Sequence, residues 1–138
     1  MPTLSVIVVN KKTNNVINNE YPNILLDDSI KKIKEKIFVF NAELIPNLIK
    51  IEIKDDSGNF IIINDSNSLL FEHFESIPEE PTIFISNLQD IISQKQLENL
   101  YMDDSQFKPL FQILKKEYSD LKEDDLSFIV KLHIMNTG

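Results

Sequence analysis

The sequence predicts an α+β fold, in which one main helix lies on a small sheet and about three further helices follow. The main helix is predicted over residues 27–38 by isoleucines spaced three and four apart, with lysines between them. Strand-like stretches flank it, because residues 3–9 are rich in β-branched side chains and residues 48–54 alternate apolar with charged ones. Residues 89–138 instead carry apolar side chains at helical spacing.

The first part of the chain is predicted to contain two strands and the main helix. The first strand covers residues 3–9, and a polar turn over residues 10–15 follows it. A second strand is predicted from Val16 through Leu26, with Pro22 at an edge or bulge because proline lacks a backbone donor. Three residues can cap the main helix with a side-chain oxygen: Asp27, Asp28 or Ser29.

A hairpin and a closing strand are predicted next. Residues 48–54 form one arm, a turn built on Gly58 reverses the chain, and residues 60–63 form the other arm. Residues 66–77 are expected to be a short helix or an irregular segment that buries Leu69, Leu70 and Phe74. A last strand starts at residue 82 and is expected to run on toward Ile91.

Three helices are predicted in the last part of the chain. Ser93 and Gln96 fit a capping box at the start of the first. Ser105 is expected to cap the second, and Asp120 with Glu123 to open the third. The third helix is apolar on two faces, so we expect it to need two neighbours, one of them a partner chain or a later segment. Its second face consists of Phe128, Leu132 and Met135.

Two of the predicted strands are apolar on both faces. In residues 3–9 and 60–63, both the odd-numbered and the even-numbered positions are mostly apolar. One of these two sets of side chains must therefore point away from the main helix. Burying one such side chain contributes about 1.5–3 kcal/mol, so we expect something to cover that second face. Residues 89–138 are the expected cover.

The composition disfavours several classes of function. The formal net charge is −8, and all 14 basic residues are lysine. Nucleic-acid binders usually present a basic stripe with arginine, so we expect no nucleic-acid partner; an acidic surface suits basic partners instead. The acidic run over residues 117–125 fits a solvated helix junction, or a docking site for such a partner. The sequence contains no cysteine, which excludes disulfides and thiolate chemistry.

The sequence shows no sign of export or membrane insertion. No apolar run approaches the roughly 18 residues that a spanning helix needs. The first ten residues lack the basic start and the cleavage pattern of a signal peptide. We therefore expect a cytoplasmic protein in a reducing compartment.

Motifs that suggest chemistry have simpler explanations. The stretch Tyr101–Asp104 spells a YMDD box, but it falls between two predicted helices, where helix termination and capping account for it. Asp55–Asn59 resembles part of a calcium loop, but the glutamate needed at the twelfth position is missing. His73 and His133 lie in different segments, so we expect no metal site. With no nucleophile elbow and no phosphate loop, we predict no enzyme activity and no cofactor.

The order of elements supports a resemblance to a known family. Residues 3 to about 88 resemble a ubiquitin-like β-grasp domain, with local similarity at Asp28–Ile37, at Ile45–Pro46, at Ser68–Leu70 and at Thr82–Ile85. The resemblance implies a sheet that grips one helix and a role in binding proteins. It does not imply conjugation, because no pair of glycines follows the last strand and the chain ends Asn136-Thr137-Gly138.

The sequence thus predicts a ubiquitin-like domain over residues 1–88 and a helical extension over residues 89–138. We expect a non-catalytic protein–protein interaction module, the N-terminal docking domain of a larger intracellular or viral protein. The alternative is a structural subunit that self-associates through its C-terminal helices. Most of the apolar patch through which ubiquitin is bound is replaced here by Lys50, Glu52 and Lys54. The residues expected to bind a partner are Phe84, Lys50, Glu52, Phe128, Leu132 and Met135.

Overall fold

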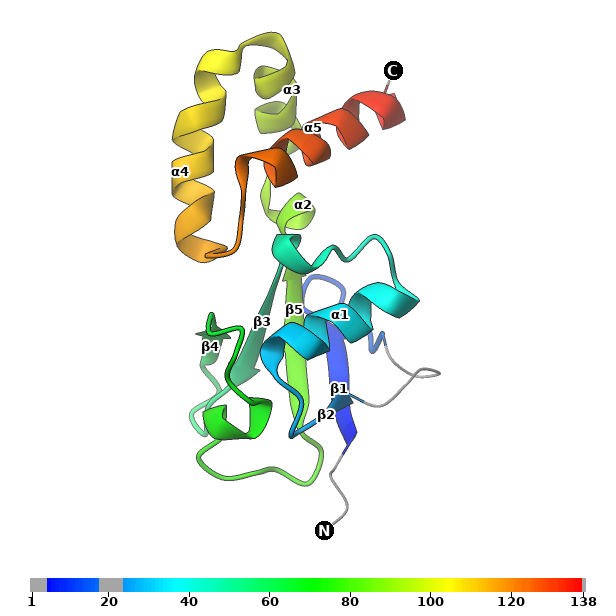
Figure 1. Ribbon diagram of the computed structural model, residues 1–138, viewed down its shortest axis with the longest axis vertical. Coiled ribbons are helices and arrows are strands. Elements are labelled where there is room, and N and C mark those ends of the chain that lie inside the picture. Colours follow the sequence, from blue (N-terminus) through cyan, green and yellow to red (C-terminus); the bar gives the residue numbers. More distant parts are fainter. Residues whose placement is uncertain (1–4, 18–23, 138) are drawn as a thin grey trace.

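The computed structural model describes residues 5–17 and 24–137, and it confirms the α+β class. A mixed five-stranded sheet carries helix α1 across one face, while helices α2 to α5 lie beyond one end of the sheet (Figure 1). The strands are β1 (Ser5–Asn10), β2 (Ile24–Leu25), β3 (Ile49–Lys54), β4 (Phe60–Ile63) and β5 (Thr82–Asn87). The α-helices are α1 (Ile30–Phe40), α2 (Leu88–Ile91), α3 (Gln94–Met102), α4 (Phe107–Glu117) and α5 (Glu123–Thr137), and the 3-10 helices are η1 (Pro46–Leu48), η2 (Leu70–His73) and η3 (Asp104–Gln106).

The strand order is β2-β1-β5-β3-β4, with β5 at the centre. Strand β1 runs parallel to β5, whereas the β1–β2, β3–β5 and β3–β4 pairs are antiparallel. A mixed sheet in this order, with one helix across it, is compatible with a β-grasp fold. Strand β4 forms one edge of the sheet.

The main core lies between α1 and the sheet face that it covers, which we call the inner face. The predicted stripe is confirmed, because Ile30, Ile33 and Ile37 are at most 1% exposed. Alternation along each strand sends every second side chain toward α1, and these residues are almost all apolar. The inner face consists of Val6, Val8, Ile49, Ile51, Ile53, Ile63, Ile83 and Ile85.

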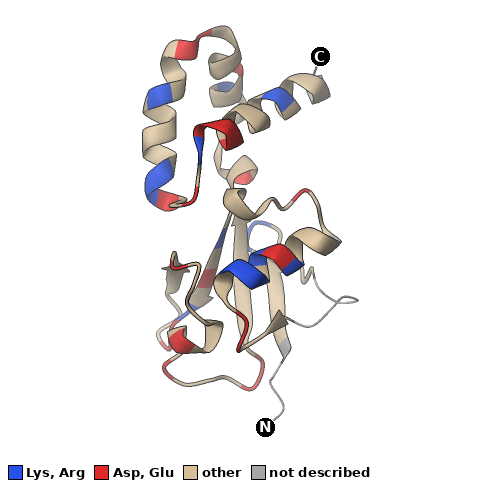
Figure 2. Ribbon diagram, viewed as in Figure 1, with Lys and Arg blue, Asp and Glu red and all other residues tan. Residues whose placement is uncertain are grey.

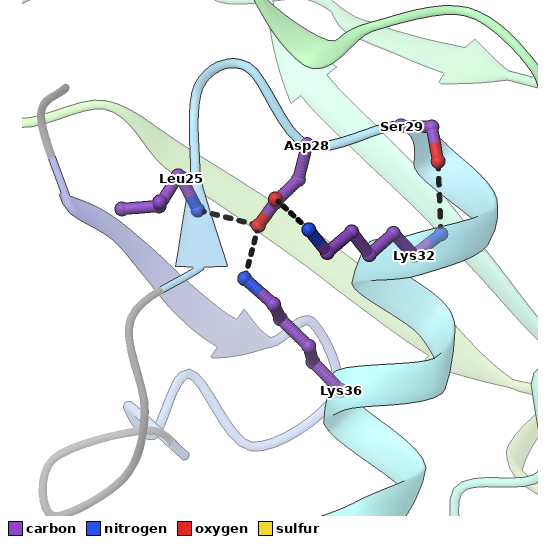
Figure 3. Close-up of polar contacts among 5 residues, drawn as sticks. All are labelled: Leu25, Asp28, Ser29, Lys32 and Lys36. Atoms are coloured by element: carbon purple, nitrogen blue, oxygen red, sulfur yellow. Dashed lines mark hydrogen bonds and ion pairs between the residues drawn. The ribbon is translucent and has the colours of Figure 1, made fainter.

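The start of α1 is held by a cap and by a buried carboxylate (Figure 3). Ser29 is the N-cap, and its hydroxyl oxygen accepts a hydrogen bond from the backbone N–H of Lys32 at 3.1 Å. The Asp28 carboxylate is buried and accepts hydrogen bonds from the Leu25 backbone at 2.9 Å and from Lys36 Nζ at 2.6 Å. Burial raises the pKa of Asp28. The hydrogen bonds and the charges of Lys36 and Lys32 lower it by more, so the pKa lies below its ordinary value. Asp28 therefore ties the end of β2 to α1.

The segment after β4, predicted over residues 66–77 as a short helix or an irregular stretch, is mostly irregular. Only Leu70–His73 forms a short 3-10 helix, and Leu70 is buried while Leu69 and Phe74 are half-buried. The Leu70 N–H donates to the carbonyl of Asp28, and the Phe71 N–H donates to that of Leu26. Because these donors pair with the β2–α1 connection, they are not available for an α-helix.

The second predicted strand is short in the described residues. Strand β2 contains only Ile24–Leu25, and Val16 makes an isolated bridge with Val9. Pro22, which is predicted to lie at an edge or bulge, is outside the described residues.

The last strand ends earlier than the sequence suggested. Strand β5 stops at Asn87, whose side chain accepts a hydrogen bond from the Gln89 N–H and caps the short helix α2. The extension to Ile91 was therefore wrong, because an asparagine side chain provides a helix cap that an apolar pattern does not reveal.

The capping box at α3 is confirmed. The Ser93 hydroxyl accepts from the Gln96 N–H at 3.2 Å, and the Gln96 side chain accepts from the Ser93 N–H at 2.9 Å. Ser105 does not cap α4; instead its N–H donates to the Asp103 carboxylate, and η3 precedes the helix.

Helix α5 starts at Glu123 instead of Asp120. The Asp125 carboxylate accepts a hydrogen bond from the Lys122 N–H at 3.1 Å, so the capping interaction lies two residues further along the chain. Asp120 remains in the turn between α4 and α5, where it contacts the sheet half of the molecule. No helix among residues 24–137 combines the length and apolar character needed to cross a membrane.

The last 50 residues cover the second face of the sheet at one end alone, where the turn after α4 brings Glu117 and Tyr118 to Lys50, so the expected cover is partial. Helices α2 to α5 form a hydrophobic cluster of their own beyond the end of the sheet (Figure 1). Helices that follow β5 directly are placed at its end, and their apolar stripes face one another there. The cluster consists of Leu48, Leu88, Ile92, Leu97, Phe111, Leu114, Tyr118, Leu121, Leu126 and Ile129.

Candidate functional site

The sheet face opposite α1, which we call the outer face, carries the first group of predicted partner-binding residues. The register places Glu52 opposite Phe84, and Lys50 opposite Ser86, as the alternation of β3 predicted. It also places Lys54 opposite Phe60 and Glu52 opposite Ile62. Three of the six predicted residues therefore lie together: Phe84, Lys50 and Glu52.

An aromatic pair lies at the exposed end of this face. The rings of Phe60 and Phe84 meet edge to face, with centroids 5.1 Å apart. Lys54 Nζ lies 5.2 Å from the Phe60 centroid and 5.1 Å from that of Phe84, and Lys11 Nζ lies 4.2 Å from that of Phe60. Lysine and ring contacts of this kind contribute about 0.5–1 kcal/mol each at exposed sites. We call Phe60, Ile62, Phe84, Lys11 and Lys54 the aromatic patch.

Glu52 is not available at the surface. It is 3% exposed, with Lys11 Nζ at 2.8 Å and Lys50 Nζ at 4.0 Å from its carboxylate oxygens. A buried carboxylate needs such cations, because it has lost its hydration. Glu52 thus orients the ammonium groups of Lys11 and Lys50 on the outer face of the sheet.

The other end of the outer face is closed by the turn after α4. Lys50 Nζ lies 3.7 Å from the Glu117 carboxylate and 5.9 Å from the centroid of the Tyr118 ring. Burial raises the pKa of the Tyr118 hydroxyl, and the nearby carboxylates of Glu117, Asp90 and Glu52 raise it further. This end of the face is therefore an internal contact between the sheet and the helices.

A second contact joins the same turn to α1. Asp120 lies 3.7 Å from Lys34 Nζ, and the Ser66 hydroxyl donates to its carboxylate at 3.3 Å. Burial lowers the pKa of Lys34, and the charge of Asp120 partly offsets this effect. These contacts fix the helices against the sheet half.

A cavity of about 390 Å³ opens at the exposed end of the sheet, next to the aromatic patch. Ile61 and Phe84 are part of its wall, and Lys54 and His73 also line it. Its acidic wall residues are Asp55, Asp56, Glu75 and Glu80.

The second group of predicted residues lies on α5. Phe128 is 44% exposed and Leu132 is half-buried, and both line a cavity of about 720 Å³ together with Ile45 and Leu97. Met135 is 78% exposed near the end of the helix and does not line this cavity. The structure therefore keeps the two predicted groups on separate surfaces.

Sequence reasoning did not single out Phe60, Ile62 or Lys11 as site residues. The sequence did contain a signal for Phe60 and Ile62, because residues 60–63 are all apolar. Alternate side chains of this strand therefore had to face outward. Lys11 follows β1 and meets Phe60 only through the sheet order, which local sequence does not specify.

The other motifs are accounted for by local structure. In the YMDD stretch, Asp103 ends α3 and accepts a hydrogen bond from the Ser105 N–H, which lowers the pKa of Asp103. In the calcium-like stretch, the Asp55 carboxylate accepts from the N–H groups of Ser57 and Asn59, and Gly58 has a φ of +85°. Among the described residues, no three His, Asp or Glu side chains are grouped as metal ligands.

Comparison with known proteins does not identify a relative. No family model matches the sequence, and no curated protein matches it.

Proposed function

We propose that this chain is a non-catalytic protein–protein interaction module. Residues 1–88 form a non-conjugating ubiquitin-like β-grasp domain in this proposal, and residues 89–138 form its helical extension. The central β5, its parallel neighbour β1 and the helix α1 across one face support the β-grasp assignment. We further propose that it acts in the cytoplasm as the N-terminal docking domain of a larger intracellular or viral protein, without a cofactor.

The observation that carries this proposal is the exposure of the aromatic patch. Phe60 is 41% exposed and Ile62 is 38% exposed, beside the half-buried Phe84. Fully burying a large apolar side chain contributes about 1.5–3 kcal/mol, so a partner that covers these residues gains affinity from them. The occupant we propose is a protein segment with apolar side chains.

The chemistry of the patch suits recognition. Aromatic side chains are enriched at binding hot spots, and a polar rim commonly surrounds them. Here Lys11 and Lys54 lie over the rings and provide that rim.

Peptide selection tests this proposal. We would select peptides from a random display library against the wild-type chain and measure their affinity for Phe60→Ser and Phe71→Ser. Phe71 lies on η2 and has the same 41% exposure as Phe60, so it is a matched control. We expect selected peptides to lose at least about tenfold in affinity with Phe60→Ser but not with Phe71→Ser, which corresponds to about 1.4 kcal/mol. Peptides that bind both variants equally, or a selection with no enrichment, would contradict the proposal.

The second candidate function is self-association through α5. The cavity between Ile45, Leu97, Phe128 and Leu132 supports it, with a second copy of the chain as the occupant. Light scattering across protein concentration tests this, together with the double variant Phe128→Ser and Leu132→Ser. A concentration-dependent mass that the double variant abolishes without unfolding would support assembly, and a strict monomer would contradict it.

A further inference from the structure

Strand β4 presents unpaired backbone groups at the edge of the sheet. The Asp55 N–H donates to the Asn59 carbonyl and closes the hairpin, and hydrogen-bonded pairs alternate from that point. Ile61 and Ile63 therefore bond to β3, whereas the N–H and C=O groups of Phe60 and Ile62 point away from it. No hydrogen bond recorded among the described residues uses these outward groups.

Three of the four side chains of β4 are exposed, and they lie on both faces of the sheet, while Ile63 is buried. Phe60 and Ile62 point to the outer face, and Ile61, on the α1 side, is 42% exposed beside the cavity of about 390 Å³. Protein edges are usually protected by lysine, proline or a bulge within the strand, and Phe60–Ile63 contains none of these. A strand added along β4 could therefore form hydrogen bonds with its outward N–H and C=O groups and pack against its exposed apolar side chains.

The charges around β4 decide which occupant fits. Asp55 and Asp56 precede the strand, Asp65 follows it, and acidic segments lie in the loops at this end of the sheet (Figure 2). Two lysines, Lys11 and Lys54, lie over the outer-face rings, with Nζ atoms 4.2 Å and 5.2 Å from the Phe60 centroid, whereas the carboxylates lie beyond the two ends of the strand. Asp55, Asp56, Glu75 and Glu80 also line the cavity beside Ile61, and the other titratable residues in its wall are His73 and Lys54.

A second copy of this chain fits these charges poorly. If β4 paired with β4 of a second copy across a two-fold axis, Phe60 of one would lie opposite Ile62 of the other. The Asp56 end of each strand would then meet the Asp65 end of its partner, at both ends of the ladder. Like charges placed opposite each other destabilise strand pairing, and each chain already carries a net charge of −8.

We propose that β4 binds an extended segment of a partner protein by strand addition, and that this segment has alternating apolar residues between basic ends. Its backbone pairs with the N–H and C=O groups of Phe60 and Ile62 as a sixth strand of the sheet. Its lysine or arginine side chains face the carboxylates at the two ends of β4. This inference rests on the proposed function as a binding module and names the partner's chemistry.

Amide hydrogen exchange with defined peptides tests the inference. The probe is a short synthetic peptide with alternating isoleucine and threonine in the middle and two lysines at each end. The control peptide has two glutamates at each end instead. The amides of Ile61 and Ile63 are internal controls, because they bond to β3 with or without the peptide.

We expect the lysine-ended peptide to slow exchange at Phe60 and Ile62 and to bind at least about tenfold more tightly than the glutamate-ended one. Unchanged exchange at these two amides, or equal binding of both peptides, would overturn the inference. Slow exchange that appears without peptide, as protein concentration rises, would assign the edge to a second copy and would also overturn it.

Two variants separate strand addition from a loss of folding. Ile62→Pro removes the outward donor at a position where an edge strand tolerates proline. Ile62→Lys keeps the donor but adds a protective positive charge to the edge, and Ile62→Val is the matched control. We expect both Ile62→Pro and Ile62→Lys, but not Ile62→Val, to abolish binding of the lysine-ended peptide while the Ile61 and Ile63 amides stay protected. Binding that persists in Ile62→Lys would overturn the inference even where the proline variant unfolds.

Failure of this inference is distinguishable from failure of the proposed function. Peptide-induced chemical shifts around Phe84 and Lys54, without protection at Phe60 and Ile62, would exclude strand addition but leave a binding module. Loss of the module itself would appear in the display selection, as the absence of peptides that depend on Phe60.

Discussion

The two faces of the sheet are formed by alternate residues of the same strands, but they differ in how far their side chains are buried. On the inner face, Ile51 and Ile53 are at most 1% exposed beneath α1. On the outer face, Phe60 and Ile62 on the neighbouring strand remain 41% and 38% exposed. The amino-acid types are similar, so the difference comes from what each face packs against.

The outer face is itself divided along its length. Near the helices, Lys50 lies 3.7 Å from the Glu117 carboxylate and 5.9 Å from the centroid of the Tyr118 ring. Toward the hairpin turn, Lys11 lies over the ring of Phe60 and Lys54 lies over that of Phe84. The inner face is therefore covered by α1, whereas the outer face is covered at one end by the turn after α4.

The largest expected effect is the difference in stability loss between Ile51 on the inner face and Ile62 on the outer face. Ile51→Ala removes a fully buried side chain and should lower the free energy of unfolding by about 2–5 kcal/mol. Ile62→Ala should lower it by less than about 1 kcal/mol, because the side chain remains exposed in the folded state. Denaturant unfolding followed by circular dichroism measures both. Equal losses would show that the outer face is as closely packed as the inner one.

A smaller effect is expected at the carboxylate that anchors α1 over the inner face. Asp28→Asn should lower the free energy of unfolding at neutral pH by about 1.5–3 kcal/mol, through its weakened bonds to Lys36 and Leu25. Because the folded-state pKa of Asp28 is lowered, its contribution is fully present above the unfolded pKa of about 4 and is lost as pH falls through the folded value. Unfolding of wild type and variant between pH 7 and pH 2 measures this difference. A difference that is constant across the range would contradict the assignment.

The sealed end of the outer face should tolerate loss of a hydroxyl. The Tyr118 side chain is buried, and its hydroxyl has no hydrogen-bond partner among the described residues. Tyr118→Phe should therefore raise the free energy of unfolding by up to about 1 kcal/mol, since an unpaired buried polar group is destabilising. Tyr101→Phe is the control, because Tyr101 is 60% exposed. A clear loss of stability in Tyr118→Phe would reveal a hydrogen bond at that hydroxyl.

The smallest effect is expected at the open end of the outer face. Lys54→Gln removes the ammonium group from the rings of Phe60 and Phe84 and should lower the free energy of unfolding by about 0.5 kcal/mol. Lys108→Gln is the control, because it changes the net charge equally at an exposed position on α4. Thermal unfolding of both variants under one condition would resolve the difference, and identical midpoints would contradict a role for the lysine on the rings.

Much of the sheet and of α1 could be predicted from local pattern. The spacing of Ile30, Ile33 and Ile37 and the alternation of residues 48–54 each specify which side chains face inward, because helix and strand periods are fixed by backbone geometry. The positions of Lys50, Glu52 and Phe84 on the opposite face followed from the same alternation. The exposure of these side chains could not be predicted in the same way, because the buried Glu52 pairs with Lys11, a residue that follows β1 and lies far away in the sequence.

The sequence by itself determined the α+β class, the buried stripe of α1 and the two-faced apolar character of β4, because each depends on neighbours within a few residues. Only the tertiary structure decided that β4 lies at an edge, that Lys11 and Phe60 meet, and that α2 to α5 pack beyond the sheet instead of across it. These features depend on contacts between residues distant in the chain, which a local pattern does not encode. The open end of the outer face is the result, and it is there that a partner is expected.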